Sequence, residues 1–224
     1  MNIANESELD KFIKQYPDTK MMEILMPDMN GIIRCKRIPR EEFSTFFCHG
    51  VKGPASTTLL NVRGEFCDEV DFANLEGDPD KLIYPVAGTL APITWLKSDT
   101  AQVLATFTEL DGSPALFDAR NILYKALLPL QAKGLSPVVA TELEFYLIKS
   151  GDGPLPELFL AKIPGTSVDQ SGTQYAMPED LWDNDEFLED VRVACEVQNV
   201  PMTTVHSEFS PGQFEINLHH VGNP

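Results

Sequence analysis

The chain has 224 residues, of which 17 are Lys or Arg and 34 are Asp or Glu, so its formal net charge is −17 at neutral pH. Hydrophobic residues make up 43% of the chain and charged residues 23%, which is typical of a folded protein and excludes disorder as the main state. So acidic a chain repels phosphate backbones and anionic lipid surfaces, and we expect neither nucleic acid nor a membrane as a partner.

The sequence has no segment with the features of a signal peptide or a transmembrane helix. Its first ten residues contain three acids and no basic or apolar leader region, and no window of about 18 apolar residues follows. The four cysteines lack both the CxxC spacing of zinc sites and the density of disulfide scaffolds: Cys35, Cys48, Cys67 and Cys195. We therefore expect reduced thiols and a cytoplasmic protein.

Residues 1–112 predict a compact α+β domain. Strand-like runs at 20–26 and 32–38 flank Asn30-Gly31, which accepts the positive φ angles of a hairpin turn. A short helix is expected over 39–47, because its first turn is acidic and three phenylalanines share one face. Further strands are expected at 57–62, 83–86, 89–96 and 102–110, and the Asp-Gly-Ser-Pro run at 111–114 marks the expected domain boundary.

Residues 113–224 predict a second α+β region. Asp118 can cap a helix over 119–133, in which Ile122, Leu123, Ala126, Leu127 and Leu130 share a face. A long strand is expected over 136–148, and a second helix runs from Asp183 or Asp185 to about residue 199. The last two expected strands, 201–208 and 213–219, lie on either side of Pro211-Gly212.

Two acidic residues interrupt the apolar strand at 136–148. Glu142 and Glu144 are two positions apart, so both side chains project from the same face of the strand. Placing two like charges together inside an apolar environment is costly unless a cation compensates. The pair therefore indicates a cation site, and the alternative is a solvated strand face with Tyr146 beside it.

A second acidic cluster, at 206–217, supports the cation site. Alternation places His206 and Glu208 on one face, and it places together a second set: Gln213, Glu215, Asn217 and His219. Glu208 and Glu215 are an odd number of residues apart, but Pro211-Gly212 can supply a bulge or turn that resets the register. Four carboxylates with a histidine nearby suit Mg²⁺ or Mn²⁺ better than zinc, and the alternative is a pair of polar edge strands.

The two acidic segments resemble the metal-ligand signatures of the glutamine synthetase family. These segments read Thr-Glu142-Leu-Glu144-Phe-Tyr and Glu208-Phe-Ser-Pro-Gly-Gln-Phe-Glu215-Ile-Asn. The hairpin at 27–39, the Gly77-Asp78-Pro79-Asp80 segment and the interval from Glu208 to Glu215 resemble the γ-glutamylpolyamine (γ-glutamylputrescine) synthetase branch. The resemblance implies a β-grasp domain over 1–112 and the first part of a catalytic α+β domain over 113–224.

The resemblance also implies an activity and roles for individual residues. ATP would activate the γ-carboxylate of glutamate as γ-glutamyl phosphate, and an amine, either a polyamine or ammonia, would then displace the phosphate. Glu144, Glu208 and Glu215 would bind one Mg²⁺ or Mn²⁺ ion, Glu142 would serve a second ion beside ATP, and His206 would lie near the nucleotide. Asp78 or Asp80 would attract the amine cation in a neighbouring subunit's site, although this sequence departs there from the family's Asp-Gly-Ser pattern. A homo-oligomer of the dodecamer type would follow.

Family members continue well beyond the second acidic cluster, whereas this sequence stops at Pro224, so we expect a fragment or truncated product that is inactive alone. The second hypothesis is a non-catalytic assembly or interaction protein on the same fold. A third, a carboxylate-site metallohydrolase, lacks an identifiable base and leaving-group acid.

The acidic run at 179–190 is interpreted as helix N-terminal charge rather than a calcium loop. The basic cluster Arg34, Lys36, Arg37 and Arg40 is interpreted as an anion site or as partners for acids across a subunit contact.

Overall fold

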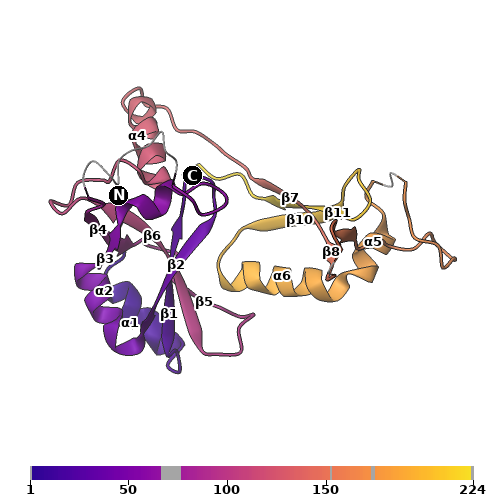
Figure 1. Cartoon of the computed structure of the whole chain (residues 1–224), viewed down its shortest axis with the longest axis horizontal. Helices are drawn as coiled ribbons and strands as arrows, with labels where there is room; N and C mark the ends of the chain where they lie inside the picture. The colour runs from indigo at the N-terminus through magenta and orange to yellow at the C-terminus, as the bar shows by residue number, and fades with distance from the viewer. Residues whose placement is uncertain (1, 67–76, 152, 173–174, 223–224) are drawn as a thin grey trace. The chain divides into compact units, whose positions relative to one another are not determined.

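The computed structural model describes residues 2–66, 77–151, 153–172 and 175–222, so Cys67 lies outside the described residues. The chain forms two compact units, Met1–Leu135 and Ser136–Pro224. Both units combine helices with β-sheet, which confirms the α+β class (Figure 1). The division between these two units falls after Leu135, and the expected domain boundary at 111–114 stays a prediction. Among the described residues, no helix is long and apolar enough to cross a bilayer.

A mixed sheet forms the centre of the N-terminal unit. Its strand order is β2-β1-β6-β4-β3, with β5 paired to β6, and only the β1–β6 pair is parallel. The strands are β1 Met21–Pro27, β2 Ile33–Pro39, β3 Val51–Pro54, β4 Asp80–Pro85, β5 Ala91–Pro92 and β6 Thr100–Thr108. The predicted hairpin is therefore confirmed as β1 and β2.

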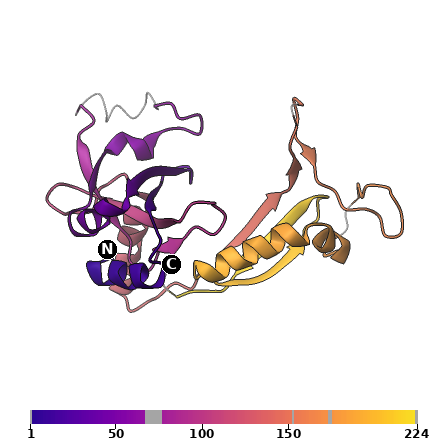
Figure 2. The same ribbon diagram turned by 90° about the horizontal axis from the view of Figure 1, so that it is seen from below.

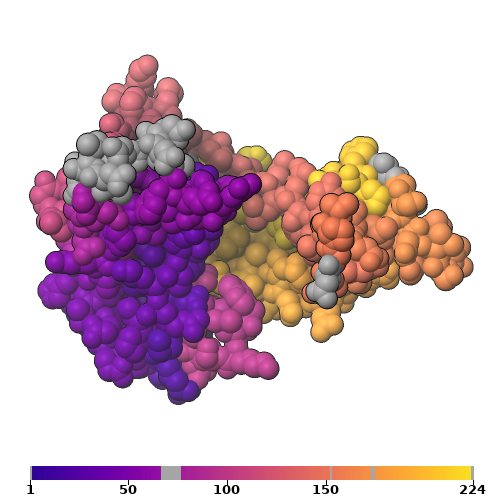
Figure 3. All heavy atoms as spheres, in the orientation of Figure 1, coloured from indigo at the N-terminus to yellow at the C-terminus, as the bar shows by residue number. Residues whose placement is uncertain are grey.

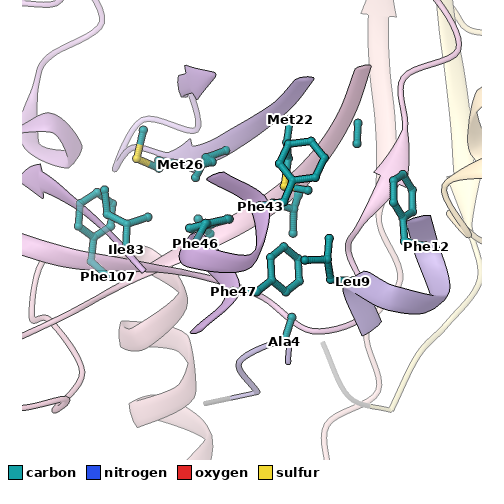
Figure 4. Packing of buried hydrophobic residues seen from close by; sticks show 14 of the residues in the cluster. Ala4, Leu9, Phe12, Met22, Met26, Phe43, Phe46, Phe47, Ile83 and Phe107 are labelled. Carbon is teal, nitrogen blue, oxygen red and sulfur yellow. The ribbon is translucent and has the colours of Figure 1, made fainter. Parts of the chain in front are cut away.

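Helices α1 (Glu6–Gln15) and α2 (Phe43–His49) supply the apolar side chains that pack with this sheet. Met22, Ile24 and Met26 alternate along β1 and are all buried, as the period of a strand requires. They share one cluster with residues of both helices and of β4 and β6 (Figure 4): Leu9, Phe12, Phe43, Phe46, Phe47, Ile83 and Phe107. The phenylalanine face predicted for 39–47 is thus buried, with the 3₁₀ turn η1 (Arg40–Glu42) preceding α2.

Two sequence-based expectations fail in the N-terminal unit. The strand expected at 57–62 is instead the 3₁₀ helix η2 (Ala55–Leu59), where the Thr58 hydroxyl donates to the carbonyls of Ala55 (3.1 Å) and Phe117 (2.8 Å). The strand expected at 89–96 is reduced to the two residues of β5. In both cases side-chain hydrogen bonding and turn chemistry outweigh the β propensity of the local sequence.

Helix α4 (Ala119–Gln131) begins where the sequence predicts, at the cap residue Asp118. The carboxylate of Asp118 accepts from the N–H of Arg120 (2.8 Å) and from the N–H of Phe107 on β6 (2.7 Å). Its expected apolar face is nevertheless exposed, because the helix buries only Asn121. The helix projects from the surface of its unit (Figure 3) and is fixed to it by polar contacts.

The C-terminal unit contains a three-stranded antiparallel sheet in the order β10-β11-β7. These strands are β7 Glu142–Tyr146, β10 Met202–Ser207 and β11 Gln213–Leu218, and a short ribbon of β8 (Ile148–Lys149) with β9 (Glu157–Leu158) lies beyond β7 in sequence. The acidic run at 179–190 lies within helices α5 (Pro178–Asp183) and α6 (Asp185–Val197) and the residue that joins them. Helix α6 lies along the sheet (Figure 2). The long strand expected over 136–148 is shortened to five residues.

Candidate metal centre

The sheet of the C-terminal unit has one apolar face and one polar face. On the apolar face the Phe145 ring stacks on Phe214 at 6.0 Å between centroids and meets Phe187 of α6 edge-on at 6.1 Å. Alternation then directs the neighbouring residues of all three strands to the opposite face. That polar face carries the acidic residues of both predicted signatures.

Strand pairing places three of these residues in one row across the sheet. His206 of β10 lies opposite Glu215 of β11, and Glu215 lies opposite Glu144 of β7. Directly opposed residues of antiparallel strands share a face, with Cβ atoms about 4.5–5.5 Å apart. A second row places Glu142 opposite Asn217. The predicted convergence of distant acids therefore follows from the register, although Glu142 and Glu208 are far apart in sequence.

The turn between β10 and β11 brings Glu208 back beside Glu215. The N–H of Glu208 donates to the Gln213 carbonyl at 2.8 Å, and the chain reverses over the four intervening residues. Gly212 has a φ of 74°, and a Cβ there would lie 3.1 Å from the carbonyl oxygen of Phe159, so this position favours glycine. The register reset expected at Pro211-Gly212 is a hairpin turn rather than a bulge.

His206, Glu208 and Glu215 form a compact group, with one potential ligand atom from each lying within 4.8 Å of the others. The Nε2 atom of His206 is 3.0 Å from Oε1 of Glu208 and 3.7 Å from Oε2 of Glu215. Glu215 is only 8% exposed, which makes a lone carboxylate there costly. The two carboxylates at this spacing fit a small hard cation such as Mg²⁺ or Mn²⁺, because such ions prefer oxygen ligands, and the imidazole adds one nitrogen donor.

The two clustered carboxylates titrate differently. The N–H of Phe209 holds the pKa of Glu208 below its ordinary value, and His206 contributes in the same direction. The Asn217 amide lowers the pKa of Glu215, but burial and the adjoining Glu208 carboxylate outweigh it and raise that pKa. Crowding by the Glu208 carboxylate therefore favours the protonated form of Glu215 more than in an isolated carboxylate, and a bound cation would relieve this repulsion.

The two acids of β7 lie at the edge of this group. Glu144 accepts a hydrogen bond from the Gln213 amide at 2.7 Å, and both Glu142 and Glu144 are exposed. Their exposure agrees with the alternative of a solvated strand face, whereas the burial of Glu215 does not. The assignment of Glu142 and Glu144 as ligands stays a prediction, and so does the nucleotide role of His206.

The N-terminal candidates lie in other surroundings. The carboxylate of Asp78, whose φ is 49°, accepts from the N–H (3.1 Å) and hydroxyl (2.6 Å) of Ser56, while Asp80 begins β4 and is exposed. All four residues of the basic cluster make contacts within their own unit: Arg34 with Asp28, Arg37 with Glu23, Lys36 with the Lys52 carbonyl, and Arg40 with the carbonyls of Pro17 and Thr19.

Sequence reasoning missed the residues that hold the strand β10 in place. Ser207 ends β10, Asp180 interacts with Ser207, and Tyr175 contacts His206; none of the three belongs to either acidic signature. Ser207 was detectable as a polar residue at an apolar-facing position of a strand. Asp180 was hidden inside a run of helix N-terminal acids.

Comparison with known proteins shows which family and which enzymes this chain is similar to. Residues 116–223 match the family described as glutamine synthetase, catalytic domain. The γ-glutamylputrescine synthetase PuuA of Escherichia coli K12 is 33% identical over 98% of this chain and 46% of its own length. The glutamate–isopropylamine ligase of a Pseudomonas species is 28% identical over 85% of this chain and 41% of its own length.

A solved structure of GmaS in complex with ADP superposes with a TM-score of 0.72 at 17% identity, covering 96% of this chain and 44% of that one. This likeness concerns the fold alone. The chain thus spans less than half the length of the relatives that it matches.

Proposed function

This chain is related to the glutamine synthetase family, and we propose that it is part of an ATP-dependent ligase that joins the γ-carboxyl group of glutamate to an amine through γ-glutamyl phosphate. The observation that carries the proposal is the row His206–Glu215–Glu144 with Glu208 beside it. Both signature segments contribute to that row. The two relatives, a γ-glutamylputrescine synthetase and a glutamate–isopropylamine ligase, support an amine as the acceptor.

The acidic face of the sheet would hold the divalent cations that this reaction needs. Glu208 and Glu215, with Glu144 across β11, would bind one Mg²⁺ or Mn²⁺ ion, and Glu142 would serve a second ion next to ATP. Bound cations neutralise the phosphate and carboxylate groups that must approach each other. In this chain His206 orients the Glu208 carboxylate, and Glu215, buried between two strands, supplies a fixed ligand position.

The amine would meet an acidic loop of the N-terminal unit. Since the Asp78 carboxylate is engaged by Ser56, the exposed Asp80 is the better candidate to attract an amine cation. The resemblance to the polyamine branch favours putrescine over ammonia. We assign the mixed N-terminal sheet to the β-grasp type and the protein to the cytoplasm. We also assign a homo-oligomer of the dodecamer type, because in this family one subunit's N-terminal domain lends its loop to a neighbour's site.

Formation of γ-glutamyl product from ATP and glutamate tests this function, with ammonia, a monoamine and putrescine compared side by side. The 224 residues alone are expected to form none, because they supply three carboxylates for one ion but a single one for the other. A longer frame containing them, where one exists, is expected to prefer putrescine. Preference for ammonia would overturn the choice of amine, product from the 224 residues would overturn the expected inactivity, and a product-free longer frame would favour the non-catalytic assembly protein.

A further inference from the structure

Ser207 is the last residue of β10, lies between the site residues His206 and Glu208, and faces the other side of the sheet. Because side chains alternate along a strand, His206 and Glu208 share the polar face and Ser207 is directed away from it. Ser207 is 2% exposed. A buried hydroxyl needs hydrogen-bond partners, and here they come from one short segment that lies just before and within α5.

Residues 176–180 supply the partners of Ser207. Its carbonyl oxygen accepts from the N–H of Ala176 at 3.0 Å, and its hydroxyl oxygen accepts from the N–H of Met177 at 2.9 Å. The carboxylate of Asp180, which is 3% exposed, interacts with the same hydroxyl from within α5. Burial raises the pKa of Asp180, as expected for a carboxylate withdrawn from water. Asp180 is therefore not one more solvated acid of the run at 179–190.

The same segment also reaches the polar face. Ala176 has a φ of 57°, an unfavourable conformation for a residue with a Cβ, which surrounding contacts must maintain. Next to it, the Tyr175 hydroxyl lies 3.4 Å from Nε2 of His206, and the two rings meet edge-on at 5.4 Å. Residues 175–180 thus contact β10 on both faces at the positions that flank the site.

We propose that the Ser207 hydroxyl and the Asp180 carboxylate form a positioning pair that fixes His206 and Glu208 in the geometry that binds the divalent cation. This inference rests on the proposed function, since it assumes a cation at the acidic face. Neither residue touches the cation. The pair acts through the backbone of Ser207, because one of its neighbours, Glu208, carries a ligand atom and the other, His206, orients that carboxylate. Outer hydrogen bonds orient the ligands of other metal sites in the same way.

Mn²⁺ binding to the 224-residue chain tests the pair, with the dissociation constant measured by calorimetry or by the electron paramagnetic resonance of free Mn²⁺. Asp180→Ala and Ser207→Ala should weaken binding by about tenfold or more, the usual effect of losing such an outer partner. Asp180→Asn should stay close to the parent, because its carboxamide oxygen can still accept from the Ser207 hydroxyl. Glu186→Gln, at an exposed acid of α6, is the matched control and should change nothing.

The outcomes separate this inference from the proposed function. If the parent chain binds no Mn²⁺, the cation site itself fails. If the parent binds but Asp180→Ala and Ser207→Ala bind equally well, the positioning pair is wrong. If Asp180→Asn loses as much affinity as Asp180→Ala, the effect is that of charge and not of the hydrogen bond. Should Asp180→Ala not fold, as judged by circular dichroism, Ser207→Ala decides alone.

Discussion

The two units of the chain differ in what holds them together. Among the described residues, the N-terminal unit buries nineteen hydrophobic side chains, while the C-terminal unit buries four: Ala161, Leu188, Phe214 and Ile216. In the C-terminal unit, α6 covers one face of the sheet, and the other face carries acidic side chains. The first unit is thus organised by its apolar core, whereas the second depends on polar contacts and, by our proposal, on a cation. The candidate metal site therefore lies in the unit with the smaller apolar core.

Removing one phenylalanine from each unit should give the largest difference in the free energy of unfolding. Phe46 is 0% exposed, and Phe46→Ala should lower the free energy of unfolding by about 3–5 kcal/mol. Phe187 is 41% exposed, so Phe187→Ala should cost about 1 kcal/mol. Urea unfolding followed by far-UV circular dichroism measures both. Equal losses would show that the C-terminal unit has a core as well packed as the first.

The buried Asp28 tests the polar reinforcement of the N-terminal unit. Its carboxylate accepts from the N–H groups of Asn30 (2.8 Å) and Ile32 (2.9 Å) and pairs with Arg34 at 2.8 Å. Asp28→Ala should cost about 3 kcal/mol, because a buried ion pair loses one partner. Chemical denaturation at neutral pH measures this loss, and Asp10→Ala on the exposed face of α1 is the control.

The same carboxylate should make the first unit acid-sensitive. Burial pushes the pKa of Asp28 up, but the Ile32 N–H, Arg34 and the Asn30 N–H outweigh it and hold that pKa below its ordinary value. A depressed folded pKa means that the stabilisation is complete above the unfolded pKa of about 3.9 and is lost as pH falls through the folded pKa. Asp28→Asn should flatten this acid limb, and an unchanged limb would contradict the assignment.

Adding Mn²⁺ should stabilise the C-terminal unit and so reduce the difference in stability between the two units. A cation present at 100 times its dissociation constant stabilises the folded state by about 2.7 kcal/mol, which should appear as a higher melting temperature. The double variant Glu144→Gln, Glu215→Gln should abolish the rise while leaving the metal-free chain at least as stable, because like charges are removed. A double variant that responds to Mn²⁺ as the parent does would place the site elsewhere.

The smallest effect should be that of pH on the site. Since the pKa of Glu215 is raised in the folded state, its repulsion with Glu208 is absent at low pH and develops as pH rises through that pKa. Metal-free stability should fall slightly over this window, and Glu215→Gln should remove the decline. Mn²⁺ affinity should move oppositely, weakening by up to about tenfold per pH unit below the window as one proton competes. A pH-independent affinity would contradict Glu215 as a ligand.

Local sequence patterns predicted how the two acidic segments come together better than they predicted the elements that support those segments. The hairpin at Asn30-Gly31, the cap at Asp118 and the pairing of the two acidic segments all follow from turn chemistry and alternation. Helix α1 was missed, although Leu9 and Phe12 lie three residues apart and are both buried. The contact of Ser207 with Asp180 could not be predicted, because it joins two segments that are far apart in sequence, and helix or strand periodicity gives no information about such contacts.

The attachment of α4 has a consequence for how the molecule opens. The helix buries Asn121 alone, and that amide donates to the carbonyls of Phe107 (2.8 Å) and Ala115 (3.0 Å). Detaching it breaks a few hydrogen bonds and exposes almost no apolar surface, so little of the global unfolding free energy opposes the event. In deuterium exchange, the amides of α4 should lose protection far sooner than those of β1 and β6, and binding of anything to the helix should be visible as slowed exchange there.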